Sequence, residues 1–392
     1  MVTETQKKPK EYKQTEVGRI PTDWEVKELR TLVHFHNGKA HERYISDYGE
    51  YVVINSKFIS SEGKVFKYSN RNLSPGCAGD ITLVMSDIPN GKALAKCYLI
   101  EQNIRFAINQ RICALRAEDI DSKFLYYKLN RNSYFLQFDN GVSQTNLRKD
   151  EVLSCPLAVP SSKEEQTAIA TVISEVEQHI ATLESLIAKK RAIKQGAMQE
   201  LLTGKRRLSG FSGKWEAVRL SDLLDYERPD KYIVKSADYI EKGQIPVLTA
   251  NKSFLLGYTN EEIGIFDKVP VIIFDDFTTD SKYVDFSFKV KSSAIKILKK
   301  KDNRINLKYI YGRMKLIDFP LGDHKRYYIS EYQNILIPMP KSDEQTAIAQ
   351  VLSDMDAEIE KLEQKLTKYK MLKQGMMQVL LTGKVRLVCP NQ

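Results

Sequence analysis

The sequence contains one long stretch twice. The first copy runs from Glu165 to Leu208 and the second from Glu344 to Leu387, an offset of 179 residues. Aligned without a gap, the two copies are identical at 24 of 44 positions. A repeat of this length constrains the architecture, because both copies are expected to adopt the same structure. The chain therefore alternates two variable segments with two nearly constant ones.

Each copy is predicted to form one long helix. In the first copy, apolar residues recur in steps of four and three at Ile169, Ile173, Val176, Ile180, Leu183 and Ile187. The second copy continues this pattern at Ile348, Leu352, Met355, Ile359, Leu362, Leu366 and Tyr369. Such spacing is the seam of a coiled coil, so we expect the two helices to pair with each other. The alternative is that each helix lies flat on its own domain.

Local signals mark both ends of each helix. Ser162 with Glu165, and Ser342 with Gln345, match the capping box of a helix start. The sequence Leu-Leu-Thr-Gly then provides a glycine at the end of each copy, where a left-handed residue commonly stops a helix. A helix of about 40 residues is roughly 60 Å long.

The order of the segments predicts how the helices run. The second variable segment starts directly after the first helix, and the second helix leaves it. If the repeats are equivalent, a pseudo-twofold axis relates them and the helices are antiparallel. The second helix then returns to the first variable segment, where Trp24-Glu25 corresponds to Trp215-Glu216. The predicted chain is nearly circular, because its end returns to its beginning. The distance between the variable segments is expected to match roughly one to two turns of duplex DNA.

Both variable segments read as mixed α and β structure. In the first, β-rich runs cover 51–59, 79–85, 93–100 and 111–117, followed by helical spacing over 121–138. In the second, the runs cover 245–251, 269–276, 282–288 and 293–298, followed by a helix over 306–317. The predicted fold class is α+β: two mixed α/β domains and two long antiparallel helices that form a coiled coil, in a pseudo-twofold circular organisation. The predicted domains are a flexible tail (1–16), a first variable domain (17–160), a first helix (161–208), a second variable domain (209–340), a second helix (341–387) and a short tail (388–392).

Net charge and cysteine usage indicate the kind of partner and the cellular compartment that suit this chain. The net charge of +10 suits a polyanionic partner such as nucleic acid, although basic surfaces also occur in ordinary soluble proteins. The five cysteines form no C-x-x-C pair and are odd in number, which favours free thiols in a reducing compartment. The sequence has no apolar run long enough to span a bilayer and no secretory signal, so we expect a cytoplasmic protein.

The motifs of common catalytic centres are missing from the sequence. There is no P-loop, no G-x-G-x-x-G fingerprint and no zinc-ligand spacing. His34, His36 and His41 form a small group, which we interpret as satisfied surface imidazoles and not as a metal site. Asp276, Asp280 and Lys282 could belong to a nuclease centre, but the same residues also suit a polar strand end. We therefore expect no catalytic residues, no metal and no cofactor in this chain.

The candidate DNA-binding residues are polar and basic side chains in loops. Arg, Lys, Asn and Gln reach base edges, while Ser, Thr and Tyr mainly contact phosphates. In the first segment the candidates are Lys39, Arg43, Asn55, Lys57, Ser86, Asn90, Lys92, Asn109, Arg111, Ser143, Gln144, Asn146 and Arg148. In the second they are Arg228, Lys231, Asn251, Lys252, Thr278, Thr279, Lys282, Lys325, Arg326 and Tyr327. Each could equally be a solvated loop residue.

The repeated motifs resemble a known family. The helix start Glu-Gln-x-x-Ile-Ala (at 165 and 344), the ending Lys-Gln-Gly-x-Met-Gln-x-Leu-Leu-Thr-Gly-Lys (194–205 and 373–384) and Gly-x-Ile-Pro-x-x-Trp-Glu (18–25) are similar to the specificity (S) subunit of type I restriction–modification enzymes. The second variable segment opens on Phe-Ser-Gly-Lys-Trp-Glu and so departs from the last motif. The resemblance covers essentially the whole chain.

The resemblance implies a non-catalytic subunit that recognises DNA. Each variable domain would read one half of a bipartite, asymmetric sequence. The helices would set the spacing and dock two methyltransferase (M) subunits, which carry S-adenosylmethionine and methylate adenine. Restriction (R) subunits would add cleavage with ATP and Mg. Docking candidates near the helix ends are Met198, Leu201, Met376 and Met377, which could instead pack the seam.

Two alternatives remain open at this point. One is a subunit of a free-standing restriction enzyme with an unrecognised nuclease centre. The other is a coiled-coil dimerisation scaffold with no role on DNA. The DNA sequence read and its spacer length do not follow from the residues, because recognition also depends on loop geometry and DNA deformation.

Overall fold

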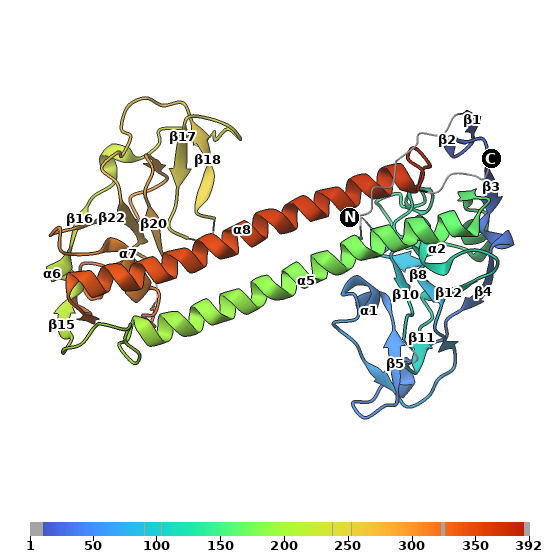
Figure 1. The fold of residues 1–392 in the computed structure, drawn as a ribbon, viewed down its shortest axis with the longest axis horizontal. Coiled ribbons are helices and arrows are strands. Elements are labelled where there is room, and N and C mark those ends of the chain that lie inside the picture. Colours follow the sequence, from blue (N-terminus) through green and yellow to red (C-terminus); the bar gives the residue numbers. More distant parts are fainter. Residues whose placement is uncertain are drawn as a thin grey trace. The chain divides into compact units, whose positions relative to one another are not determined.

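The computed structural model describes residues 11–89, 91–102, 104–236, 238–251, 253–322 and 326–387. The chain forms two compact units. Unit 1 comprises Met1–Thr182 with Leu366–Gln392, and unit 2 comprises Leu183–Lys365. The helices α5 (Lys163–Leu201) and α8 (Ser342–Leu380) each continue from one unit into the other (Figure 1). Each unit therefore contains one end of each long helix.

The repeat copies form single helices of 39 residues each, as predicted. Both end before a glycine with positive φ, Gly204 at +74° and Gly383 at +69°. A residue with a Cβ is strained in this left-handed conformation, which explains the glycine of the Leu-Leu-Thr-Gly ending. The predicted capping box forms only in part: Ser162 Oγ accepts a bond from Glu165 N at 3.3 Å. The Glu165 carboxylate does not return to the helix start, because it has other partners described below.

Within each unit the two helices are antiparallel, as predicted. In unit 1, Glu177 of α5 pairs with Lys373 of α8 at 2.6 Å. In unit 2, Lys194 of α5 pairs with Asp356 of α8. The offset of 179 residues maps Lys194 onto Lys373 and Glu177 onto Asp356, so the same ion pair occurs once in each unit with the helices exchanged. This exchange is the pseudo-twofold relation expected from the repeat.

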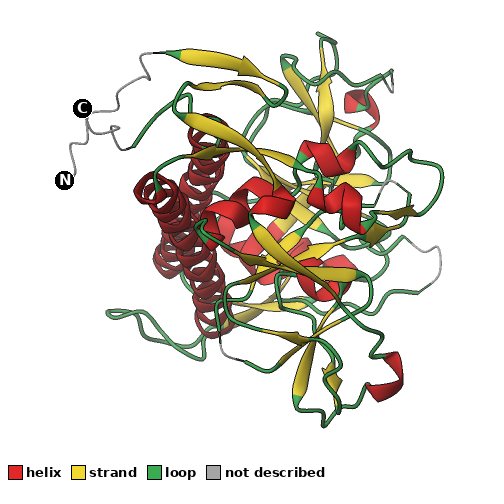
Figure 2. Ribbon diagram, turned by 90° about the vertical axis from the view of Figure 1, so that its right-hand side faces the viewer, coloured by secondary structure: helices red, strands yellow, loops and turns green. Residues whose placement is uncertain are grey.

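Unit 1 contains two four-stranded sheets. Among the described residues, the helices other than α5 and α8 are short (Figure 2). The first sheet is antiparallel, in the order β10 (Cys97–Leu99), β8 (Asp80–Val84), β12 (Ile112–Ala117) and β4 (Val33–Asn37). The second has the order β6 (Tyr68–Ser69), β5 (Tyr51–Ile54), β11 (Phe106–Ile108) and β7 (Pro75–Gly76), with β5 and β11 parallel.

Three strand pairs and several short helices complete unit 1. The pairs are β1 (Tyr12–Thr15) with β2 (Gly18–Pro21), β3 (Trp24–Glu28) with β14 (Pro156–Pro160), and β9 (Ser86–Asp87) with β13 (Thr145–Asn146). The helices are η1 (Leu29–Thr31), η2 (Glu42–Tyr44), α1 (Ser56–Ser60), α2 (Ser122–Leu129), α3 (Ser133–Leu136) and α4 (Lys149–Leu153). Strand β1 lies in the segment expected to be a flexible tail, so that expectation is wrong for residues 12–15.

Unit 2 repeats this plan. Its antiparallel sheet has the order β16 (Leu224–Glu227), β22 (Ile295–Lys300), β19 (Val271–Asp275) and β20 (Ser281–Val284). A second sheet has the order β18 (Leu255–Thr259), β17 (Ile245–Leu248) and β21 (Lys289–Val290), with β17 and β21 parallel. Strand β15 (Glu216–Arg219) pairs with β23 (Leu336–Met339). The short helices are α6 (Leu220–Leu223), η3 (Asp230–Tyr232), α7 (Leu307–Met314) and η4 (Tyr332–Asn334).

The two units correspond strand by strand. β4, β12, β8 and β10 of unit 1 match β16, β22, β19 and β20 of unit 2, and the parallel pair β5–β11 matches β17–β21. The predicted fold class, two mixed α/β domains with paired antiparallel helices, is confirmed. In the described residues no helix is both long and apolar enough to cross a membrane.

Some element boundaries differ from the predictions. The run 51–59 is strand only as far as Ile54 and then turns into α1, because Asn55 caps a helix there. The helix expected over 121–138 breaks into α2 and α3 at Arg131, whose φ is +58°. A non-glycine residue in this conformation interrupts a right-handed helix.

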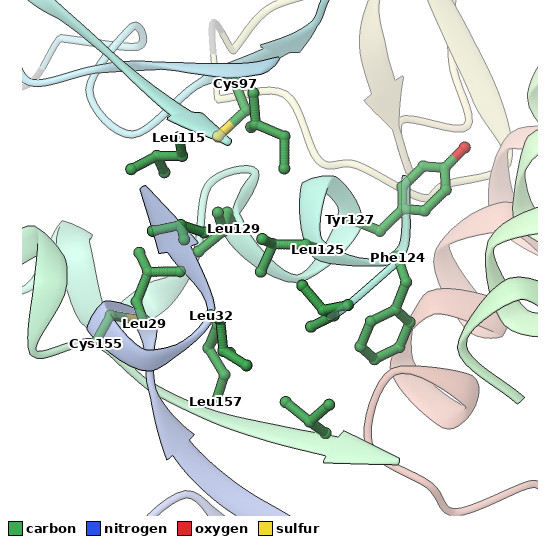
Figure 3. Packing of buried hydrophobic residues seen from close by; sticks show 14 of the residues in the cluster. Leu29, Leu32, Cys97, Leu115, Phe124, Leu125, Tyr127, Leu129, Cys155 and Leu157 are labelled. Carbon is green, nitrogen blue, oxygen red and sulfur yellow. The ribbon is translucent and has the colours of Figure 1, made fainter. Parts of the chain in front are cut away.

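The core of unit 1 joins its sheets to both long helices. Phe124, Leu125 and Leu129 of α2 are fully buried among residues of the strands, as Figure 3 shows. The same cluster includes Ile169 of α5 and, from the other end of the repeat, Leu380 of α8. Unit 2 has the counterpart, with Leu201 of α5 and Ile348 of α8 in one cluster. Each unit therefore needs the start of one helix and the end of the other to complete its core.

Candidate functional site

A buried ion cluster joins the helices to the rest of unit 1. Glu165, near the start of α5, accepts hydrogen bonds from Arg386 Nη2 at 2.6 Å and from Trp24 Nε1 at 3.3 Å. Arg386 also donates through Nη1 and Nη2 to the two carboxylate oxygens of Asp23, at 2.8 and 2.7 Å. The hydrogen bond from Arg386 is the largest cause that lowers the pKa of Asp23. We call Trp24, Glu165 and Arg386 the unit 1 joint.

Unit 2 has an equivalent cluster built from the other ends of the helices. Glu344 of α8 accepts bonds from Arg207 Nη2 at 2.6 Å and from Trp215 Nε1 at 3.1 Å. The hydrogen bond with Glu344 raises the pKa of Arg207. The offset of 179 maps Glu165 onto Glu344 and Arg207 onto Arg386. We call Trp215, Glu344 and Arg207 the unit 2 joint.

The two joints bring the N-terminal segment next to the end of the second helix, as the predicted circular organisation requires. In each joint the glutamate begins one long helix and the arginine follows the end of the other. Trp215 follows the first helix directly in sequence, whereas Trp24 meets the end of the second helix only by folding. The N-terminal segment thus occupies, beside the second helix, the place that the segment after the first helix occupies in unit 2.

The glutamine of each Glu-Gln motif holds a short helix of the variable domain. Gln166 accepts a bond from Asp121 N at 2.9 Å and donates to Pro160 O at 3.0 Å. Gln345 accepts a bond from Asn306 N at 2.9 Å and donates to Pro340 O at 2.9 Å. Asp121 and Asn306 are the N-cap residues of α2 and α7. The expected capping role of Gln345 is therefore wrong, because its amide is used to fix α7 against α8.

Loops of unit 1 bring three DNA-binding candidates together. Ser86 Oγ donates to Asn146 Oδ1 at 2.6 Å, and Gln144 Nε2 donates to Ser86 Oγ at 2.8 Å. The cluster forms because β9 and β13 pair at the end of β8, next to the start of β12. Within this cluster Gln144 and Asn146 are exposed, and Arg111, just before β12, is exposed as well.

The corresponding loops of unit 2 bring together two further candidates. Arg228 follows β16 and Arg326 precedes η4, yet both line one pocket at the end of β19. The backbone confirms that the two places correspond. Leu147 N bonds to Met85 O at 2.7 Å in unit 1, and Tyr327 N bonds to Asp276 O at 3.0 Å in unit 2.

Most candidates are accessible. The exposed ones are Lys39, Arg43, Lys57, Lys92, Arg111, Ser143, Gln144, Asn146, Arg148, Arg228, Lys231, Asn251, Thr278 and Arg326. Thr279 and Lys282 are half-buried. Asn90, Lys252 and Lys325 lie outside the described residues.

Four candidates have structural roles that the sequence did not indicate. Tyr327 is only 2% exposed, and its hydroxyl donates to Gly322 O at 2.7 Å, so it is not available to DNA. Asn55 caps α1 by accepting from Phe58 N at 2.9 Å. The amide of Asn109 accepts from His41 N and donates to Glu42 Oε1. Ser86 is buried and holds its loop in place. Polar residues next to turns often serve the backbone in this way.

The docking candidates lie in or against the cores of the two units, and whether any of them contacts a partner stays a prediction. Leu201 belongs to the core of unit 2, and Met198 packs against it. Met376 and Met377 pack against the core of unit 1. Other apolar residues of the helices are more exposed, namely Leu186, Ile193, Met371 and Leu372. Ile193 and Leu372 are 48% and 47% exposed, and they are equivalent by the offset of 179.

The histidine and aspartate groups also have structural partners, and the interpretation as a surface imidazole is wrong for His41. His41 is fully buried, with Nδ1 2.6 Å from Lys39 O and Nε2 3.0 Å from Leu73 N. Asp276 pairs with Lys296 at 3.1 Å. Across the described ranges, no three His, Cys, Asp or Glu side chains are grouped closely enough to hold a metal ion.

Comparison with known proteins identifies the family. The family model described as type I restriction modification DNA specificity domain matches residues 21–194 and 212–368. The chain belongs to this family. Both variable domains of the specificity subunit are thus covered by a DNA specificity domain, and the resemblance stated from the sequence is confirmed.

Named relatives agree with this assignment. The specificity subunit of the type I restriction enzyme EcoR124I/EcoR124II from Escherichia coli is 48% identical over 151 residues, a match that spans 37% of each chain. A putative type I restriction enzyme MjaX specificity subunit from Methanocaldococcus jannaschii is 24% identical, covering 97% of this chain and 98% of the relative. Because these relatives are specificity subunits, homology supports the expectation of a non-catalytic chain.

Solved structures share the fold. The crystal structure of a type I restriction-modification system S subunit from M. genitalium superposes with a TM-score of 0.65 at 17% identity, covering 95% of this chain and 99% of that one. A chain from a structural study of complex assembly and conformational transition of the type I system gives a TM-score of 0.54 at 14% identity, covering 93% and 99%. At these identities the likeness concerns the fold alone.

Proposed function

We propose that this specificity subunit reads a bipartite, asymmetric DNA sequence, with one half contacted by each variable domain. The observation that carries the proposal is the contrast between the two units. They have the same strand order, but the loops at the end of the central strand present Gln144 and Asn146 in unit 1 and Arg228 and Arg326 in unit 2. Different side chains on one framework are suited to reading different bases. We propose 17–160 and 209–340 as the two reading domains.

The long helices would set the spacing between the half-sites. Each reading domain is fixed to its helices by a buried ion cluster and by a glutamine bridge, so its orientation on the helix ends is well determined. A rigid attachment of this kind converts helix length into a distance along DNA. The spacer length is therefore expected to follow the length of α5 and α8.

The helices would also dock two methyltransferase subunits. Ile193 and Leu372 are exposed apolar residues, and each precedes by three positions a helical glycine, Gly196 or Gly375. Apart from the adjoining residues and the backbone of the same helix, no atom of the described residues lies within 4 Å of where a Cβ on either glycine would point. Glycine inside a helix costs about 1 kcal/mol relative to alanine, and here no neighbour in the chain requires it. A partner that approaches the backbone closely would require it, and the surface occurs once in each unit.

In this proposal catalysis belongs to the partner subunits. Two methyltransferase subunits would bring S-adenosylmethionine and methylate adenine, and restriction subunits would bring ATP and Mg for cleavage. Family membership favours this subunit over a free-standing restriction enzyme or a scaffold without DNA. One structural relative comes from a study of complex assembly in the type I system, which is consistent with partners of this kind.

Methylation mapping tests the reading function. The chain is expressed with its methyltransferase subunits, and the methylated sites of the host genome are sequenced. The expected result is a two-part asymmetric motif with a fixed unspecified spacer. A continuous motif, or methylation with no sequence preference, would contradict the proposal.

Glutamate substitutions test the docking surfaces. Ile193→Glu and Leu372→Glu are each expected to leave a complex with one methyltransferase subunit, and the double variant a complex with none, as measured by native mass spectrometry. Val142→Glu, an 83% exposed apolar position in a loop of unit 1, is the matched control and is expected to keep both. Full occupancy of the double variant would rule these surfaces out.

A further inference from the structure

Unit 2 contains a small basic pocket at the end of its central strand. The pocket has a volume of about 170 Å³ and is lined by Arg228, Pro229, Asp230, Asp276, Ser293, Lys296, Arg326 and Ile329. These residues come from the end of β16, the end of β19, the start of β22 and the loop before η4. Four separate segments thus converge on one concave site, within the domain proposed to read DNA.

The floor of the pocket holds a buried ammonium group. Lys296 is 4% exposed, and its Nζ lies 3.1 Å from Oδ2 of Asp276, which is 2% exposed. The other carboxylate oxygen of Asp276 accepts a bond from Tyr328 N at 2.8 Å. An ammonium has three donors, so the contact with Asp276 leaves capacity for a further acceptor. Since Lys296 lines the pocket, that acceptor can come from a bound molecule.

Packing does not explain a lysine at this position. β22 and β19 pair Asp275 with Ile295, as β12 and β8 pair Val84 with Ile112. The next residue along β22 is Lys296, and the next along β12 is Cys113, which is fully buried. Unit 1, which has the same strand order, therefore has a small buried thiol at the position that Lys296 occupies in unit 2. Burying a charged pair is costly, so the pair in unit 2 calls for a role beyond filling space.

The rim of the pocket carries two exposed arginines. The guanidinium carbon of Arg326 lies 5.6 Å from the ring centre of Phe277, an arrangement that orients the group by a cation–π contact. Arg228 stands on the opposite segment, after β16. Three cations thus face two carboxylates, and the Asp276 carboxylate is already engaged by Lys296 and by the backbone. The charge and donor pattern fits an anion with several oxygens.

The shape of the site selects among the anionic and polar groups of DNA. Base edges lie at the floor of a groove, so proteins read them with side chains that project. A phosphate projects from the backbone and can enter a concave site. We propose that this pocket binds one backbone phosphate of the half-site read by unit 2, with Lys296 at its floor and Arg228 and Arg326 at its rim. The inference rests on the proposed function of this domain.

Salt dependence of binding tests the pocket. The wild-type complex with its methyltransferase subunits is compared with Arg228→Gln and Arg326→Gln complexes on duplexes that carry the mapped site. Each variant is expected to bind about tenfold more weakly at low salt, as for the loss of one charged hydrogen bond. The slope of log K against log salt should become shallower by about 0.9, the value for one phosphate contact. The loss should be equal on the mapped site and on sites with base changes in either half.

A control substitution of an arginine outside the pocket and a scan of the DNA backbone phosphates make the test specific. Arg304→Gln removes an exposed arginine beyond the opposite end of β22, where it pairs with Asp302, and should leave affinity and slope unchanged. Duplexes with one neutral methylphosphonate linkage at a time should show one linkage, in the half read by unit 2, whose replacement weakens the wild type but not Arg326→Gln. Additive losses at every linkage would overturn the pocket, as would unchanged slopes or a loss confined to one base position.

A double variant addresses the floor of the pocket. Lys296→Met with Asp276→Asn avoids leaving a buried carboxylate without its partner, and its folding can be followed by the fluorescence of Trp215. If the folded double variant binds DNA with the wild-type slope, the pocket is overturned. A wild-type complex with no sequence preference would instead refute the proposed function, so the two failures can be told apart.

Discussion

At the scale of single residues, the joints carry the most concentrated interactions in the chain. Glu165 and Arg386 are 2% and 6% exposed in their side chains, so neither charge could be left alone without a large desolvation cost. In unit 2, Arg207 is less enclosed, with 25% of its side chain exposed. Burial therefore makes the unit 1 joint the more sensitive of the two.

Removing Arg386 should destabilise unit 1 strongly. Arg386→Met keeps much of the side-chain volume but leaves Glu165 buried without its cation, which costs about 3–5 kcal/mol. The free energy of unfolding from urea titrations of the full chain measures this loss. Arg207→Met should cost less, because Glu344 can then regain some contact with water. The double variant Arg386→Met with Glu165→Met should recover part of the loss; equal losses in all three variants would contradict this account of the joint.

The unit 1 joint should also depend on pH. The pKa of Asp23 lies below its ordinary value of 3.8, mainly because Arg386 donates hydrogen bonds to the carboxylate. A depressed pKa in the folded state means that the contribution is complete above pH 3.8 and is lost as the pH falls through the lower, folded value. Asp23→Asn should therefore be less stable than the wild type near neutral pH, and the difference should shrink in acid. Urea titrations at several pH values measure it, and a difference that grows in acid would be inconsistent with the hydrogen bonds described.

The candidate residues show how far side-chain roles can be read from a sequence. Residue type and loop position selected Arg326 and Asn146, which lie at corresponding places in the two units. Whether either residue contacts DNA stays a prediction. Residue type and loop position were not enough to exclude Tyr327 or Asn55, because a loop residue that serves the backbone has the same composition as one that faces solvent. Only the tertiary contacts separate the two cases.

At the scale of elements, the long helices combine a buried seam with an exposed glycine motif. Steps of three and four place Leu183, Ile187 and Ile359 in the seam, where they are 4% to 8% exposed. Gly196 and Gly375 lie outside it, with open space beyond their backbones. The seam was predictable from periodicity alone, whereas the exposed face could be interpreted only after the seam had been located.

Lengthening both helices should change the spacing read on DNA. Seven residues inserted after Ser185 in α5 and after Gln364 in α8 keep the seam in register, because a coiled coil repeats every seven residues. They add about 10 Å of helix, roughly three base pairs. Methylation mapping should then give the same half-sites with a spacer longer by about three base pairs.

An insertion in only one helix provides the control. It would shift one helix against the other and break pairs such as Lys194–Asp356 and Lys373–Glu177 on one side of the insertion. We expect that single insertion to abolish methylation. An unchanged spacer after the double insertion would show that the helices do not measure the distance between half-sites.

At the scale of the whole molecule, the two reading domains should be exchangeable. The boundaries at 209 and 340 lie beside the strand pair β15–β23, which closes the second domain on itself. Replacing residues 209–340 by the corresponding domain of another family member should alter one half of the methylated motif only. Arg207 lies outside the exchanged segment, and a tryptophan at the position of Trp215 in the incoming domain keeps the unit 2 joint intact. A change in both halves, or in the spacer, would show that reading is shared between the domains.

The architecture was predictable from the repeat, but the attachment of the domains was not. Two copies of one helix imply a pseudo-twofold relation, and the ion pairs Lys194–Asp356 and Lys373–Glu177 follow it. The Glu-Gln motif was read as a helix cap, since Ser-x-x-Glu is a local signal. Its real partners, Trp24 and Arg386 for Glu165, are 141 and 221 residues away, and contacts over such separations leave no pattern in a local window.

The sharing of helix ends between the units has a consequence for the origin of the chain. Residues 1–208 contain a tryptophan, a glutamate and an arginine, Trp24, Glu165 and Arg207, which are the residue types of a complete joint. In unit 1, however, the arginine is Arg386 of the second repeat. In a pair of such half-chains, Arg207 of each copy could replace Arg386 for the other. A gene half as long could therefore have encoded a symmetric homodimer that read a palindrome. Duplication and fusion would then have freed the two variable domains to diverge, and the asymmetric target proposed above could have arisen from a symmetric one in this way.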